Sequence, residues 1–143
     1  MQQETNSAGL SVLVQDAQDN SAEAVFRIGD LAREFGLTLR ALRFYEDRKL
    51  LIPARAGSTR LYSAEHRQRL KLILLAKRIG FSLTETEEIL KVNDQETLSN
   101  EALRNLINKF KAQVSVLTAQ KLEIEQALTE VDEAVSYLES RLS

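Results

Sequence analysis

The last third of this 143-residue chain most constrains its fold, because it contains no glycine or proline to interrupt a helix. After residues 93–99, which we interpret as a polar connector, apolar residues recur at alternating spacings of four and three. This seam consists of Leu103, Ile107, Phe110, Val114, Leu117, Lys121, Ile124, Leu128, Val131, Val135, Leu138 and Leu142. Such a heptad pattern predicts a coiled-coil helix over residues 100–143.

The length of this helix favours dimerisation. At the standard rise it would extend for about 65 Å, well beyond a domain built from the rest of the chain. The alternative is an amphipathic helix that packs on its own domain. We expect a homodimer in which Lys121, the one charged residue of the seam, fixes register and oligomeric state at some cost in stability.

Residues 26–50 predict two helices joined by a tight turn. Gly36 is suited to end the first helix in a left-handed conformation, and Thr38 is suited to cap the second. The spacing from Ala32 through Gly36 to Leu42 is typical of a helix-turn-helix. In that motif a small residue lets the helices approach and a leucine fills their crossing.

Residues 50–62 predict a small β-hairpin, or wing. Pro53 opposes a helix here, and a turn signal at Gly57 separates two short runs with β propensity. Arg55 and Arg60 flank the turn, which favours a DNA contact over a lid.

Two more helices are expected before the connector. Ser63 is suited to cap the first of them, which Gly80 would end. Ser82 and Glu85 form a capping box that opens the second, which runs to about Lys91. Residues 26–92 therefore form the candidate domain.

The formal net charge of −2 conceals a basic block. Residues 26–80 contain 13 basic and 5 acidic side chains, a net charge of +8, whereas residues 92–143 have a net charge of −4. A basic block on one domain is typical of a phosphate-binding surface. Residues 1–25 are polar, with four acidic and no basic side chains, and predict a disordered acidic tail.

Several classes of function are excluded or disfavoured. The absence of cysteine excludes disulfides, thiolate metal sites and a cysteine nucleophile, and His66 is the one histidine. Glu85, Glu87 and Glu88 are interpreted as solvated acids at a helix start. We therefore expect no enzyme, no metal and no cofactor. With no membrane span and no basic secretory signal, we expect a cytoplasmic, nucleoid-associated protein that does not contact membranes.

Three stretches have a family likeness: FRIGDLAREFGLTLRALRFYEDRKLLIPAR, STRLYS and RLKLILLAKRIGFSLTETEEIL. Their order and spacing resemble the DNA-binding domain of the MerR family of bacterial transcription regulators. The resemblance implies a mainly α fold, a winged helix-turn-helix followed by a long dimerisation helix that pairs in an antiparallel coiled coil.

The implied partners are double-stranded promoter DNA, a second copy of the chain and, indirectly, RNA polymerase. Family members bind a pseudo-palindromic element and distort its spacer. The runs RFYED, RLKLIL and KRIGFSL further resemble the LiuR-like branch, which is associated with branched-chain amino-acid and acyl-CoA catabolism.

The resemblance also implies which residues contact DNA. Arg43 and Tyr45 match a run of the family that contacts the DNA backbone, in which Phe44 replaces a tyrosine and is a candidate core residue. The remaining matches come from the start of the recognition helix, the wing and a second wing before GFSL. With Arg55 of the hairpin, the expected set is Thr38, Arg40, Arg43, Tyr45, Arg55, Arg60, Tyr62, Lys77 and Arg78.

The chain departs from the sensing members of this family. Members that sense metals or thiols have cysteines at and beyond the dimerisation helix, and drug-sensing members have an extra C-terminal ligand domain. Because neither feature is present in this sequence, we expect no thiolate metal sensing, and no residue identifies a small-molecule effector.

Two other functions remain open at this point. One is a DNA-architectural or excisionase-like accessory factor, and the other is a coiled-coil interaction protein whose basic domain binds a protein. The long heptad arm favours the regulator, since excisionase-like modules generally lack it.

Overall fold

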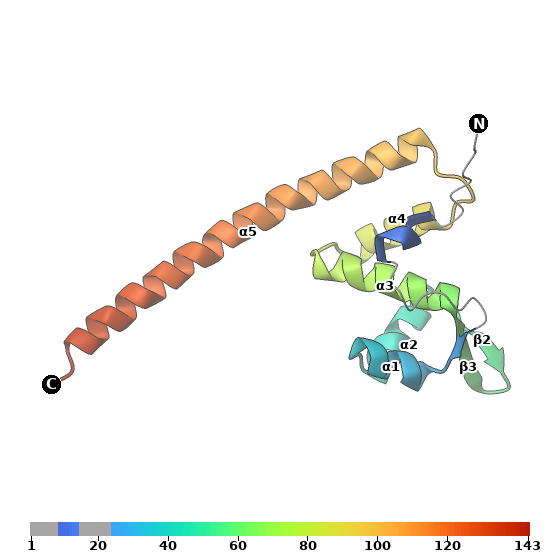
Figure 1. The fold of residues 1–143 in the computed structure, drawn as a ribbon, viewed down its shortest axis with the longest axis horizontal. Coiled ribbons are helices and arrows are strands. Elements are labelled where there is room, and N and C mark those ends of the chain that lie inside the picture. Colours follow the sequence, from blue (N-terminus) through green and yellow to red (C-terminus); the bar gives the residue numbers. More distant parts are fainter. Residues whose placement is uncertain (1–8, 15–23) are drawn as a thin grey trace. The chain divides into compact units, whose positions relative to one another are not determined.

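The computed structural model describes residues 9–14 and 24–143 and contains two compact units, residues 1–102 and residues 103–143 (Figure 1). The first unit contains all the described strands and the shorter helices. The second is the body of the long helix α5 (Asn100–Ser140). The fold is mainly helical, as the sequence predicts.

The helix-turn-helix consists of α1 (Ile28–Phe35) and α2 (Leu39–Asp47). Gly36 ends α1 in the left-handed region, with a φ of 63°. The hydroxyl of Thr38 caps α2 by accepting a hydrogen bond of 3.0 Å from the Ala41 N–H. Leu31 and Leu42 are fully buried. The predicted motif is therefore confirmed.

The wing is a hairpin of β2 (Ala54–Ala56) and β3 (Thr59–Ser63), paired antiparallel around the predicted turn. A third strand, β1 (Val25–Phe26), pairs with the other edge of β3, so the strand order is β1-β3-β2. This third strand was not predicted.

Helices α3 (Ala64–Arg78) and α4 (Leu83–Asn93) follow the hairpin. Their predicted caps are present. The Ser63 hydroxyl accepts a hydrogen bond from the His66 N–H. The Ser82 hydroxyl accepts one from the Glu85 N–H, and the Glu85 side chain accepts one from the Ser82 N–H. The core centres on α3, where Leu70, Leu72, Ile73 and Ala76 are buried.

The expected disordered tail over residues 1–25 lies mostly outside the described residues, which omit 1–8 and 15–23. Its described part differs from the expectation. The 3-10 helix η1 (Gly9–Val14) packs on α3 and α4. Leu10 is only 7% exposed, and its N–H donates to Asn93 Oδ1 at 3.1 Å. Lys71 Nζ donates to the carbonyl oxygen of Val14 at 3.0 Å.

Helix α5 is continuous over 41 residues, or about 61 Å. In the single chain its seam is exposed from Val114 onward, including Ile124, Leu128 and Val135. Most of the exposed large apolar side chains among the described residues lie on this helix. None of the described helices is long and apolar enough to span a bilayer.

Candidate nucleic-acid interface

Helix α2 presents a basic face to solvent. Arg40 and Arg43 are exposed and form no ion pair within the described part of the chain. Phe44 is 46% exposed, so the expectation that it belongs to the core is wrong. Its ring instead lies 5.5 Å from the Arg48 guanidinium. The core side of α2 is formed by Leu42 and Tyr45.

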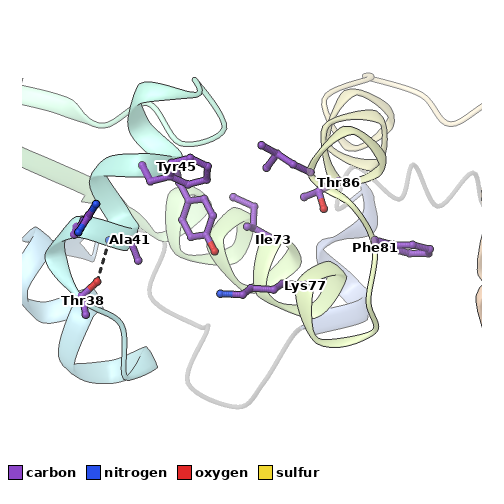
Figure 2. A pocket seen from close by; sticks show the side chains of 10 residues that line it. Thr38, Ala41, Tyr45, Ile73, Lys77, Phe81 and Thr86 are labelled. Carbon is purple, nitrogen blue, oxygen red and sulfur yellow. Dashed lines mark hydrogen bonds between the residues drawn. The ribbon is translucent and has the colours of Figure 1, made fainter. Parts of the chain in front are cut away.

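A groove separates α2 from α3 and α4 and holds about 480 Å³ (Figure 2). We call it the α2–α3 groove. It is lined by Thr38, Arg40, Ala41, Phe44, Tyr45, Ile73, Lys77, Phe81, Leu83 and Thr86. Figure 2 shows the Lys77 side chain extending from α3 towards the Tyr45 ring. Arg40 and Lys77 supply cations to this groove, and such side chains are typical contacts of the DNA phosphate backbone.

Tyr45 lies at the floor of this groove. It is only 6% exposed, and its ring packs against Phe44 with centroids 5.9 Å apart. Its position leaves the ring mainly in the core, so any contact with DNA would involve the edge that lines the groove.

Lys77 and Arg78 are exposed at the end of α3, where the chain turns towards α4. Neither forms an ion pair with another described residue. Their charges lie near a helix C-terminus, where the helix dipole favours cations. The structure therefore places both predicted residues on a surface that an anion can reach.

The two wing arginines meet one acidic side chain of α2. Arg55 and Arg60 are cross-strand partners in the hairpin. Arg55 Nη2 and Arg60 Nε each donate to the Glu46 carboxylate at 2.6 Å. The structure thus brings the wing and α2 together through Glu46, which the sequence analysis did not single out.

The position of Tyr62 in the structure does not fit the prediction that this residue touches phosphate. Its side chain is fully buried, and its ring meets His66 edge-on at 6.0 Å. Its hydroxyl has no hydrogen-bond partner among the described residues. Burial raises the pKa of this hydroxyl, and the nearby Glu46 carboxylate raises it further. In this structure Tyr62 is a core residue of the wing.

Two arginines outside the predicted set lie beside the wing. A second hollow of about 460 Å³ lies between the start of α1 and the hairpin turn, and Arg27, Arg33 and Arg60 line it. Arg33 also pairs with Asp30 at 2.6 Å. The charge excess of residues 26–80 was the only sequence signal for these positions.

Other arginines of the basic block form ion pairs and hydrogen bonds inside the domain. Arg67 is buried and its Nε donates to the Glu34 carboxylate at 2.8 Å. Arg69 donates to the Leu50 carbonyl oxygen and pairs with Asp94. The exposed basic residues of this domain therefore lie mainly on α2, the wing and the end of α3, with Arg27 and Arg33 at α1.

Comparison with known proteins identifies the family. A model for MerR HTH family regulatory proteins matches residues 26–92, and a second, for MerR DNA binding, matches residues 67–134. The chain is 34% identical over 109 residues to the HTH-type transcriptional regulator CueR of Yersinia pestis. The matched segment covers 74% of this chain and 70% of that protein.

Solved structures agree with this assignment. A MerR family transcriptional regulator from Bacillus cereus is 27% identical, with a TM-score of 0.69 over 84% of this chain and 87% of the other. HiNmlR, a MerR family regulator lacking the sensor domain, bound to promoter DNA, shares the fold at 19% identity, with a TM-score of 0.69 over 81% and 87% of the two chains. The chain therefore belongs to the MerR family of DNA-binding transcriptional regulators, which are not enzymes.

Proposed function

We propose that the protein acts as a homodimer on a pseudo-palindromic promoter element and distorts the DNA between the two half-sites. The observation that carries this proposal is the exposed seam of α5, from Val114 to Leu142, which needs a partner of equal length. A second copy of α5 supplies one. Two copies then present two α2 helices to two half-sites.

The charges beside the seam favour an antiparallel pair. If Ile107 occupies an a position, the e positions hold Arg104 and Lys111 in the first half of α5. In its second half they hold Glu125, Asp132 and Glu139. In an antiparallel pair e positions face e positions, so the basic half of each helix lies beside the acidic half of the other.

Full overlap of the two seams gives a defined register. Leu103 then packs against Leu142 of the second copy, and Lys121 lies against Ile124 of the second copy. Arg104 faces Glu139, and Lys111 faces Asp132. A parallel pair in register would instead place Lys121 against Lys121, which costs stability.

Disulfide cross-linking tests this arrangement in a chain that lacks cysteine. The double variant R104C/E139C is expected to form a covalent dimer under mild oxidation, because each cysteine would lie beside its counterpart in the second copy. The single variant L103C would cross-link in a parallel pair in register, where each core position faces its own counterpart, and it is expected to give no covalent dimer. A covalent dimer of L103C alone would contradict the antiparallel arrangement.

For DNA contacts we propose Thr38 and Arg40 at the major groove and Arg43, Tyr45, Lys77 and Arg78 at the backbone beside the α2–α3 groove. Arg55 and Arg60 extend the contacts along the wing. The exposure of these side chains supports the proposal. Four of them are solvated cations on one basic domain: Arg40, Arg43, Lys77 and Arg78. We do not retain Tyr62 as a direct contact, since it is buried.

A genome-wide binding map followed by footprinting tests the role in transcription. Protection between two promoter elements, with enhanced cleavage in the spacer, is expected for a regulator that distorts DNA for RNA polymerase. Protection at a recombination attachment site would indicate an accessory factor instead. Absence of any bound DNA fragment would leave a coiled-coil interaction protein.

The regulated genes and the signal are a separate proposal. Because the sequence contains no cysteine, we propose that it does not sense metals through thiolates. The likeness of RFYED and KRIGFSL to the LiuR-like branch supports a role at genes of branched-chain amino-acid and acyl-CoA catabolism, in the cytoplasm and on the nucleoid. The neighbours of the mapped sites test this directly.

A further inference from the structure

Glu46 lies in the last turn of α2, on the side that faces the wing. Its side chain is only 16% exposed, and the carboxylate uses both oxygens, Oε1 for Arg55 and Oε2 for Arg60, at 2.6 Å each. One side chain of the recognition helix therefore holds both strands of the hairpin.

Without Glu46, repulsion between two positive charges would destabilise the hairpin. Arg55 and Arg60 stand directly opposite one another on β2 and β3, and like charges at such positions destabilise a sheet pair. Glu46 lies against both and offsets this repulsion. The ion pairs thus fix the wing relative to α2 as well as stabilising the hairpin.

The pairs leave the arginines able to bind an anion. Arg60 donates through Nε, so both of its terminal nitrogens remain for other acceptors. Arg55 donates through Nη2 and is half-exposed. A carboxylate that holds one edge of each guanidinium restricts its rotamers before DNA arrives, which lowers the entropy cost of each phosphate contact.

We infer that Glu46 is a positioning residue for DNA binding, which sets the wing arginines in register with the basic face of α2. This inference rests on the proposed function. It makes a counterintuitive prediction, because removing a negative charge from a DNA-binding surface should by itself strengthen binding to phosphate.

The test compares two substitutions that change the charge equally. Glu46→Gln removes the carboxylate that holds the arginines, and Asp47→Asn removes the exposed carboxylate next to it. The probe is a duplex that the wild-type protein selects from a random-sequence pool. E46Q is expected to weaken binding about tenfold, whereas D47N binds as tightly as wild type or more tightly. E46Q binding at wild-type strength or better would overturn the inference.

A second comparison separates positioning from a general effect on folding. In the R55A/R60A background, measured at lower salt so that binding is detectable, adding E46Q is expected to cause no further loss. An equal loss in both backgrounds would show that Glu46 does not act through the arginines. If the wild-type protein selects no duplex, the proposed function fails; if it does and E46Q is not weaker, only this inference fails.

Discussion

At the scale of the residue, Lys49 holds the left-handed backbone conformation that follows α2, with a φ of 61°. Its N–H donates to the Glu46 carbonyl oxygen, and the Leu50 N–H donates to that of Tyr45. This turn brings Leu50 into the core. For a residue with a Cβ the conformation costs about 1 kcal/mol, which glycine avoids.

We therefore expect Lys49→Gly to raise the free energy of unfolding by about 1 kcal/mol in urea denaturation. Lys91→Gly is the matched control, because Lys91 lies in the last turn of α4 with helical backbone. There the same change should lower stability by about 1 kcal/mol. A loss of stability in both variants would contradict a strained Lys49.

Arg43 tests whether the face of α2 contacts the DNA backbone. A phosphate contact contributes to all sequences alike and releases counterions. Arg43→Ala is expected to weaken binding to specific and random duplexes by the same factor, about tenfold. The slope of log K against log salt should flatten by about 0.9.

Arg141→Ala, in which the arginine lies beyond the end of α5, is the control for lost positive charge. Weaker binding to the selected duplex alone, with an unchanged salt slope, would show that Arg43 contacts bases instead.

Sequence patterns predicted the caps but not the burial of the aromatic residues. Thr38 and Gly36 act through hydrogen bonds and backbone angles within a few residues, so local patterns predict them. Tyr62 shares a face of β3 with Arg60, because side chains alternate along a strand. Whether that face is solvated depends on α3, which begins after Ser63 and covers the Tyr62 ring.

At the scale of the element, η1 packs on the DNA-binding domain although the sequence predicted a disordered tail there. Leu10 is buried on this element and Leu13, one turn later, is 53% exposed. Leu10→Ala is expected to destabilise the domain by about 2 kcal/mol. Leu13→Ala, the same substitution on the same element, should change stability by less than about 0.5 kcal/mol. Thermal unfolding of both variants measures the difference, and equal midpoints would show that η1 does not stabilise the domain.

The elements that the sequence missed depend on distant partners. β1 is two residues long and forms only because the edge of β3 offers hydrogen bonds to Val25 and Phe26. The apolar run of η1 is too short for a core of its own and is covered only where α3 and α4 meet it. In contrast, α5 is visible in the sequence because its heptads repeat over its whole length.

At the scale of the whole molecule, the net charge of −2 reflects a division of roles. The exposed basic residues of residues 26–80 lie mainly on or next to α2, the wing and the end of α3, with Arg27 and Arg33 at α1. Others, such as Arg67 and Arg69, are held by acids of the same domain. The acidic excess of residues 92–143 lies mostly in the second half of α5, where the proposed dimer pairs it with the basic first half.

Charge reversal along α5 tests that pairing. In the variant R104E/K111E every e position except Thr118 is acidic, and in D132K/E139K the e positions are mostly basic. Each variant alone is expected to dimerise at least about tenfold more weakly than wild type, because four cross-helix pairs become repulsive. An equimolar mixture should form a heterodimer, measured by analytical ultracentrifugation at low salt.

E130K/E133K is the matched control, since these residues lie at c and f positions away from the seam and should leave the dimer intact. If the mixture dimerises no better than the separate variants, the two helices do not pair in the antiparallel register, and the promoter element need not have the symmetry that such a dimer requires.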